Sequence, residues 1–216
     1  QKEGLFLQYA ISILLSGVSL GGQYALIAIG YTMVYGILRL INFAHGDVFM
    51  AAGLMMVYLS ATLPLAAAVP LVLLLTVLLG FLIARAAYKP LRTAPRMSVM
   101  ISAIGVSYLL QNLATYATGG LPQMYPEIPG LSATVTIAGV SIKWATVITP
   151  FLVVILVVAL TQLIHHTKTG MAMRAVAKDF ETAQLMGIRL NAVISVTFVI
   201  GSFLAGVGSC LYFTNY

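Results

Sequence analysis

The sequence predicts an all-α protein, a polytopic transmembrane helical bundle whose N-terminal helices are broken or re-entrant. Only 7% of the residues are charged and 61% are hydrophobic, whereas about a quarter of the residues of an ordinary soluble domain are charged. A soluble globule of 216 residues could not bury that much apolar surface. Lipid is therefore the expected solvent for most of the chain.

Apolar stretches recur along the chain at lengths near the roughly 20 residues that a helix needs to cross the hydrocarbon. They are residues 5–20, 24–38, 48–63, 66–85, 98–115, 146–164 and 192–213. Gly17, Gly21 and Gly22 separate the first two, and the polar stretch NFAHGD, residues 42–47, separates the second from the third. Non-helical backbone survives at membrane depth only where protein or a watery cavity surrounds it. We therefore expect breaks at both places.

The basic residues indicate which loops face the cytoplasm. Segments 85–96 and 165–189 hold eight of the eleven Lys and Arg residues, whereas segment 116–145 holds one acid and one base. By the positive-inside rule the first two segments are cytoplasmic and 116–145 is an external loop. Counting crossings backwards puts residues 39–47 and the N-terminus inside. We expect one transmembrane domain over 1–216, with a small β-hairpin at 135–144 in the external loop, because that stretch alternates around Gly139.

The second basic segment predicts a short amphipathic helix over 171–186 at the cytoplasmic surface. Apolar and charged side chains fall on different faces, and Gly187 is a suitable helix stop. The apolar face carries Val176, Phe180, Ala183 and Gly187, and the charged face carries Arg174, Lys178 and Glu181. This pattern favours a docking surface for a cytoplasmic partner, and the alternative is a helix that rests on lipid headgroups.

Motifs for chemistry are missing from the sequence. It has no phosphate-binding GxxxxGK[ST] loop and no zinc-ligand spacing, and His45, Asp47, His165 and His166 match no metal pattern. We therefore expect no catalytic residue, no metal site and no cofactor. The single cysteine, Cys210, is interpreted as a packing residue.

Polar side chains within apolar stretches are the candidates for a solute path, because ionisable groups at membrane depth are costly and usually functional. The candidates are Tyr24, Tyr31, Tyr35, Asn42, His45, Gln111 and Asn112. A solvated cytoplasmic turn is the alternative for residues 39–47, with Asn42 as a helix cap. A tyrosine stripe more often serves packing or an interfacial belt than a path, and Gln111 and Asn112 equally fit hydrogen bonds between helices.

Several blocks of the sequence resemble the permeases of high-affinity branched-chain amino-acid ABC importers. They are GGQYALIAIGYTMVYGILRLINFAHGDVFMAAG at 21–53, YKPLR at 88–92, ISAIG at 101–105, and GMAMRAVAKDFETAQLMGIRLNAVISVTFVIGSFLAGVGSCLY at 170–212. Together they cover well over half of the chain, in the family's order. The central external loop resembles the family poorly, so no property of the family is carried over to it.

The resemblance implies a multi-pass protein of the bacterial inner (plasma) membrane that moves branched-chain amino acids inward. Its implied partners are a second permease subunit in a heterodimer, two cytoplasmic ATPase subunits and a periplasmic or lipid-anchored substrate-binding protein, with no nucleic acid. Residues 171–187 resemble the coupling helix that sits in a cleft of the ATPase. Arg174, Lys178, Asp179 and Gly187 match the family motif there, and Phe180 and Met186 are expected to fill the ATPase groove.

Two other functions remain open on the sequence. A permease of a urea or short-amide ABC importer has a similar block near residues 42–47. A secondary transporter or channel acting alone would explain the polar cluster around Asn42 and His45.

Since relatives of this family continue through about three more spans at roughly 20 residues each, we also expect a chain truncated at Tyr216.

Overall fold

The computed structural model describes residues 2–39, 41–91, 94–128, 130–137 and 140–215. Arg92, Gly139 and Tyr216, which entered the sequence argument, lie outside the described residues. The elements are α1 (Lys2–Leu38), α2 (His45–Ser60), α3 (Leu65–Ile83), the π-helical turn η1 (Ala84–Tyr88), α4 (Arg96–Thr118), β1 (Thr134–Ile137), β2 (Val140–Lys143), α5 (Trp144–His166), α6 (Lys168–Lys178), α7 (Phe180–Leu185) and α8 (Leu190–Asn215).

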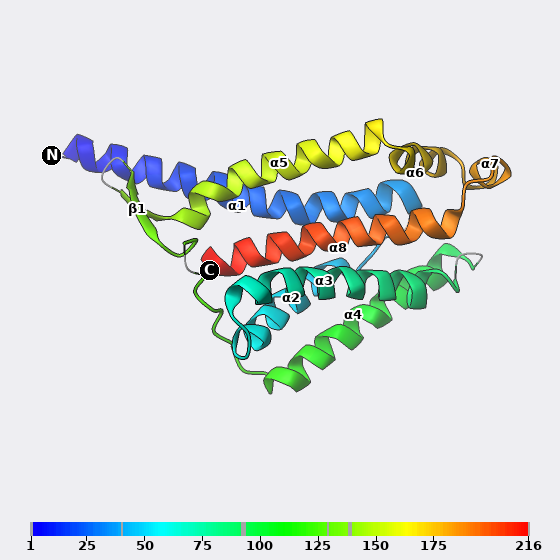
Figure 1. The fold of residues 1–216 in the computed structure, drawn as a ribbon, viewed down its shortest axis with the longest axis horizontal. Helices are drawn as coiled ribbons and strands as arrows, with labels where there is room; N and C mark the ends of the chain where they lie inside the picture. The colour runs from blue at the N-terminus through cyan, green and yellow to red at the C-terminus, as the bar shows by residue number, and fades with distance from the viewer. Residues whose placement is uncertain (1, 40, 92–93, 129, 138–139, 216) are drawn as a thin grey trace.

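Five of the described helices are long and apolar enough to cross a membrane, which confirms the predicted helical membrane bundle. They comprise residues 8–38, 65–88, 97–118, 144–166 and 190–215. Helix α8 is the most buried of them and packs against α1, α2 and α3. Figure 1 shows it running through the middle of the bundle, with α1 and α5 on one side and α3 and α4 on the other.

The expected break within the first 38 residues was wrong, because α1 is one continuous helix of 37 residues. A glycine inside a helix costs only about 1 kcal/mol relative to alanine, whereas each unpaired backbone group in lipid costs several kcal/mol. Continuity is therefore favoured. Gly22 also has a packing reason, since a Cβ there would lie 3.2 Å from Cγ2 of Val153 in α5.

The expected cytoplasmic N-terminus rested on two crossings over residues 5–38, and the structure shows one continuous helix there. Because α1 crosses once and not twice, its beginning lies at the same end of the bundle as the β1–β2 hairpin (Figure 1). Its last residues lie at the opposite end, near α6. Counting crossings from the sequence gave a cytoplasmic N-terminus because it treated residues 5–38 as two crossings.

Helix α2 replaces the span that we expected at 48–63. It has 16 residues and is therefore about 24 Å long at 1.5 Å per residue, which is less than the roughly 30 Å of hydrocarbon. The chain leaves helical geometry between Leu38 and His45, so the predicted interruption does lie at NFAHGD. Here α1 ends and the chain turns back into the bundle before α2 begins.

The hairpin predicted at 135–144 is present as the antiparallel pair β1–β2, with Thr134 opposite Lys143. The ammonium group of Lys143 donates to the carbonyl oxygens of Thr214 at 3.2 Å and Asn215 at 3.3 Å. These are the last carbonyls of α8, which have no helical donor of their own. The hairpin thus caps the central helix at this end of the bundle.

The single amphipathic helix expected over 171–186 is two helices, α6 and α7, that meet at Asp179. Asp179 has extended backbone angles, and its carboxylate accepts hydrogen bonds from the backbone N–H of Glu181 at 3.0 Å and from the hydroxyl of Thr182. An aspartate that bonds its own following backbone competes with helix propagation. Helix periodicity alone did not reveal this corner.

Candidate solute path and coupling surface

The polar segment that follows α1 lies inside the bundle and not in a solvated turn. Arg39 ends α1 with a positive φ of 53° and is exposed. Asn42, His45 and Asp47 are all buried, with between 2% and 8% of their surfaces exposed. The turn interpretation therefore holds for Arg39 and fails for the three polar side chains after it.

Asn42 faces the η1 turn and does not cap α2. Its side-chain oxygen accepts a hydrogen bond from the hydroxyl of Tyr88 at 3.1 Å, whereas the N-cap of α2 is Ala44, which makes no side-chain cap bond. The ring of Tyr88 lies 4.6 Å from that of Phe198, centroid to centroid. We call the chain between the end of α1 at Leu38 and the start of α2 at His45 the re-entrant segment. Asn42 joins this segment to α8 through Tyr88.

His45 wedges between α1 and α8 at a point where both have glycine. A Cβ on Gly30 would lie 2.8 Å from Nε2 of the imidazole, and a Cβ on Gly201 would lie 3.7 Å from its Cε1. Nε2 is buried and has no hydrogen-bond partner among the described residues. Tyr31 approaches the same ring, with 6.3 Å between centroids.

The other tyrosines of the predicted stripe lie elsewhere. Tyr24 and Tyr35 are about half exposed, at 53% and 52%, and Tyr24 packs near Tyr212 with 6.3 Å between ring centroids. Of the three tyrosines, only Tyr31 is brought to His45. The exposed pair fits the packing or interfacial interpretation that the sequence left open.

Asp47, Ser107 and Gln111 form a cluster that sequence reasoning missed. Oδ2 of Asp47 accepts from the hydroxyl of Ser107, and Oδ1 accepts from the amide Nε2 of Gln111 at 3.0 Å. The same amide nitrogen lies 3.1 Å from the Ser107 hydroxyl. The cluster links the first turn of α2 to the middle of α4. The sequence made Gln111 a candidate but did not indicate its partners. Asp47 is 64 residues away in the sequence, and Ser107 is one turn away on α4.

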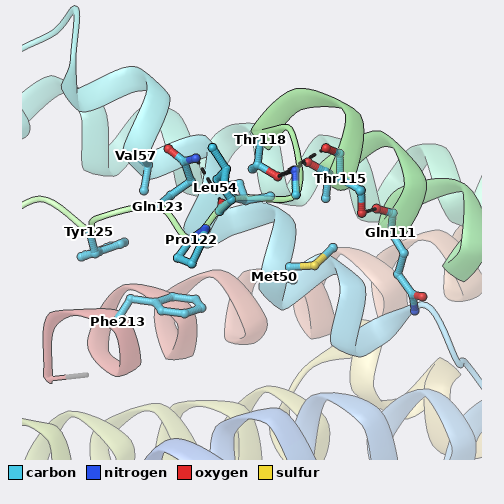
Figure 2. Close-up of a pocket in the computed structure, with 14 residues that line it drawn as sticks. Met50, Leu54, Val57, Gln111, Thr115, Thr118, Pro122, Gln123, Tyr125 and Phe213 are labelled. Carbon is cyan, nitrogen blue, oxygen red and sulfur yellow. Dashed lines mark hydrogen bonds between the residues drawn. The ribbon is translucent and has the colours of Figure 1, made fainter.

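Gln111 also lines a pocket of about 660 Å³ between α2, α4, the loop after α4 and the end of α8. Figure 2 shows Gln111 at one end of the pocket and Tyr125 and Phe213 at the other. Most of the wall between them is apolar, including Met50, Leu54 and Val57. Its volume is in the range that small-molecule sites commonly have.

Asn112 does not join this cluster. It is exposed on α4, and its amide nitrogen donates to the backbone oxygen of Tyr108 at 2.7 Å. Tyr108 and Tyr116, at 63% and 90% exposed, lie on the same side of the helix. The outer half of α4 therefore presents polar groups to its surroundings.

The opposite end of the bundle carries the candidate coupling surface, which consists of α6, α7 and Gly187. Met173 and Val176 of α6 and Ala183 of α7 are buried, and Phe180 is partly buried against the same core. Arg174 and Lys178 are exposed. The expected division into apolar and charged faces is present, and it turns Phe180 toward the bundle's own core.

Two large apolar side chains of this surface point away from the core. Leu185 is 87% exposed and Met186 is 78% exposed. Met186 borders a groove of about 460 Å³ that also includes Met171 and Lys178. Gly187 has a φ of +82°, and the N–H groups of Gly187 and Ile188 donate back to the carbonyls of Gln184 and Ala183. This Schellman geometry ends α7 as predicted.

Arg39 joins the coupling surface to the re-entrant segment. Its Nη2 donates to the carbonyl oxygens of Ala177 at 3.1 Å and Lys178 at 3.2 Å, the last carbonyls of α6. The hydrogen bonds from Thr182 and Glu181 hold the pKa of Asp179 below its usual value, and the positive charge of Arg39 lowers it further.

Among the described residues, no group of three or more His, Cys, Asp or Glu side chains could hold a metal ion.

Comparison with known proteins gives a consistent family. The family described as "Branched-chain amino acid transport system / permease component" matches residues 13–216. The chain is 39% identical to the high-affinity branched-chain amino acid transport system permease protein LivH of Escherichia coli, over 94% of this chain and 70% of that protein. It is 37% identical to the corresponding protein BraD of Pseudomonas aeruginosa, with the same coverage. No solved structure matches.

Proposed function

The chain belongs to the family of permease components of branched-chain amino acid transport systems, and we propose that it is the membrane subunit of an ATP-driven importer that carries branched-chain amino acids across the inner membrane. The observation that carries the proposal is the 39% identity to LivH over 94% of the chain. The cluster of Asp47, Ser107 and Gln111 and the pocket beside it put polar groups within the membrane-spanning part of the bundle. A protein that served only as a membrane anchor would not need them.

The family implies partner subunits, and the coupling surface supports an ATPase as one of them. Leu185 and Met186 project from a corner that Asp179 and Gly187 fix on both sides. An exposed apolar pair beside basic side chains is typical of a docking site, in which apolar anchors supply affinity and charges set orientation. We assign the anchoring role to Leu185 and Met186 and a supporting role to Phe180, which packs inward.

The mechanism that follows is alternating access. ATP binding closes two ATPases, each closure displaces a coupling surface, and the helices rock as rigid bodies around a path between two permease subunits. The path is proposed to include Gln111, with Tyr31, Asn42 and His45 near the point where the chain re-enters the bundle. A binding protein would deliver the solute at the end of the bundle that carries the β1–β2 hairpin.

The docking test replaces both anchors with Asp, as Leu185→Asp with Met186→Asp. The variant is expected to insert in the membrane but to lose co-purification of the ATPases, because two unpaired carboxylates would enter an apolar groove. The matched control is Met124→Asp, since Met124 is 94% exposed at the other end of the bundle. ATPases retained by the double variant would refute the docking assignment.

Uptake measurements test the solute. The importer assembled from this chain and its partners should accumulate leucine in vesicles that hold ATP, and should not accumulate urea. Uptake of urea in place of leucine would favour the short-amide importer. Leucine flux through the chain alone without ATP would favour a transporter that acts without ATPases.

A further inference from the structure

We propose that Asp47, held by Ser107 and Gln111, binds the ammonium group of the transported amino acid at the inner end of the pocket between α2 and α4. The inference rests on the proposed function and adds to it a residue and a chemical group of the substrate. It stands on the burial of the carboxylate, the neutrality of its partners and the character of the adjoining pocket.

The carboxylate of Asp47 is buried without a counter-ion. It is 8% exposed, and both of its hydrogen-bond donors, Ser107 and Gln111, are neutral. Among the described side chains, no cation pairs with it. The first-turn position of Asp47 in α2 gives some stabilisation from the helix dipole, worth about 2 kcal/mol at most. Most of the cost of a buried charge remains, and a cationic group bound beside the carboxylate would offset it.

The depth of Asp47 makes this cost larger. Its partners lie at the middle of α4, which runs from Arg96 to Thr118. Its neighbour His45 lies against Gly201, near the middle of α8. The carboxylate thus lies between α2 and α4 at about the middle of the membrane-spanning length of α4 and α8. Uncompensated charges at membrane depth mark substrate or ion pathways.

The pocket beside the cluster fits the rest of an aliphatic amino acid. Gln111 both donates to Asp47 and lines the pocket, so a solute that reaches Gln111 is one side chain from the carboxylate. Met50 and Leu54, one and two turns along α2 from Asp47, supply apolar wall. An ammonium group at Asp47 with a branched aliphatic chain along α2 satisfies both the charge and the apolar surface.

The exposed face of α4 carries polar side chains beside the pocket. The outward residues along most of α3 and α5 are apolar, as in Leu74, Leu78 and Val154, and are typical of lipid contact. The outer half of α4 exposes Tyr108, Asn112 and Thr115 next to Leu109 and Leu113. Polar groups on a membrane helix face a bundle interior or water in preference to lipid, which places the solute path on this side of the bundle.

The alternative is that the cluster only pins α2 to α4. Asp47→Asn separates the two roles, because the amide keeps the size of the side chain and can keep hydrogen bonds to Ser107 and Gln111 while losing the charge. Ser102→Ala is the matched control, since it removes a hydrogen bond from α4 to the carbonyl oxygen of Ala87, 3.3 Å long, and leaves the cluster untouched. Asp47→Glu keeps the charge and alters the geometry.

The experiment uses the assembled importer in proteoliposomes with leucine-loaded binding protein and ATP. We expect Asp47→Asn to assemble and to hydrolyse ATP, while its leucine uptake falls by about tenfold or more, because a hydrogen-bonded charge pair contributes at least that factor to binding. Ser102→Ala should stay within about twofold of the native rate, because Ser102 contributes neither to the cluster nor to the lining of the pocket. Asp47→Glu should recover part of the uptake.

Three results would overturn the ammonium site: native uptake in Asp47→Asn, equal loss in Ser102→Ala, or an Asp47→Glu variant no better than Asp47→Asn. Failure of Asp47→Asn to assemble would assign the carboxylate to holding the helices and would overturn it too. Uptake by the native importer distinguishes a failure of the proposed function from a failure of the ammonium site. Its failure to take up any branched-chain amino acid would refute the proposed function, whereas equal uptake by native and Asp47→Asn assemblies would refute the ammonium site alone.

Discussion

The imidazole of His45 occupies space that glycine leaves open on α1. A Cβ on Gly30 would lie 2.8 Å from Nε2 and 3.1 Å from the carbonyl oxygen of Gly201. Because one of these neighbours is backbone, the space cannot open by a side-chain rotation alone. Gly30→Ala should therefore lower stability by about 1–3 kcal/mol, the usual cost of overpacking, seen as a lower thermal midpoint in detergent.

Gly21→Ala is the control for that prediction. It lies in the same helix, and a Cβ there would meet nothing within 4 Å. Alanine is favoured over glycine inside a helix by roughly 0.5–1 kcal/mol, so this variant should unfold at or above the native temperature. If both variants unfold at the native temperature, the close contact between α1 and the imidazole is not present.

Asp179 makes the corner between α6 and α7 sensitive to pH. Hydrogen bonds from Thr182 and Glu181 hold the pKa of its carboxyl below the usual value. A group with a lowered folded-state pKa contributes stability that is present above its unfolded-state pKa and is lost as the pH falls through the lowered value. ATPase binding should therefore weaken in acid by more in the native chain than in Asp179→Asn, which caps a helix without titrating.

Binding measured for the two chains over the same acidic range tests this prediction, since titration of the ATPase itself affects both alike. Parallel pH profiles would show that Asp179 does not control the corner.

Arg39 connects two elements that the sequence separates by more than 130 residues. It ends α1 and donates to the last carbonyls of α6, while the chain after it leads directly to Asn42 and His45. Through these two hydrogen bonds, a displacement of α6 would pull on Arg39 and on the segment that follows it. In Arg39→Ala we expect ATP hydrolysis to continue while the number of ATP molecules consumed per leucine rises several-fold.

Arg85→Ala is the matched control, because Arg85 is exposed and lies in η1, away from α6. Its ratio of hydrolysis to uptake should equal the native ratio. An unchanged ratio in Arg39→Ala would show that α6 moves the path by another route.

The elements also show how far the sequence could predict the fold. Apolar length predicted the bundle, and alternation around Gly139 predicted the hairpin, because both patterns are local. Gly17, Gly21 and Gly22 misled the prediction, since glycine within a lipid-facing helix costs less than a broken backbone. Asp179 was not recognised as a corner because a polar residue on a charged helix face is ordinary.

The site was predicted less completely, for a physical reason. Asn42 and His45 stood out because they interrupt apolar sequence. The cluster of Asp47 with Ser107 and Gln111 depends on how α2 packs against α4, and those residues are 60 and 64 positions apart. Contacts between distant helices leave no periodic trace in one sequence. Ser107 alone is unremarkable within a membrane helix, where serine commonly bonds to neighbours.

Taken as a whole, the molecule has two chemically different ends. Exposed basic residues, α6 and α7 lie at one end, and the hairpin, the long loop and the beginning of α1 lie at the other (Figure 1). The positive-inside rule places the first end in the cytoplasm. Since α1 crosses once, we expect the beginning of α1 to be external.

Single cysteines test this orientation in a Cys210→Ser background. We expect a membrane-impermeant thiol reagent to label Tyr9→Cys and Met124→Cys in right-side-out vesicles, because both positions are exposed at the external end. Gln184→Cys, exposed on α7, should react only in inside-out vesicles. Labelling of Tyr9→Cys in the same inside-out vesicles as Gln184→Cys would place the beginning of α1 in the cytoplasm and would contradict a single crossing by α1.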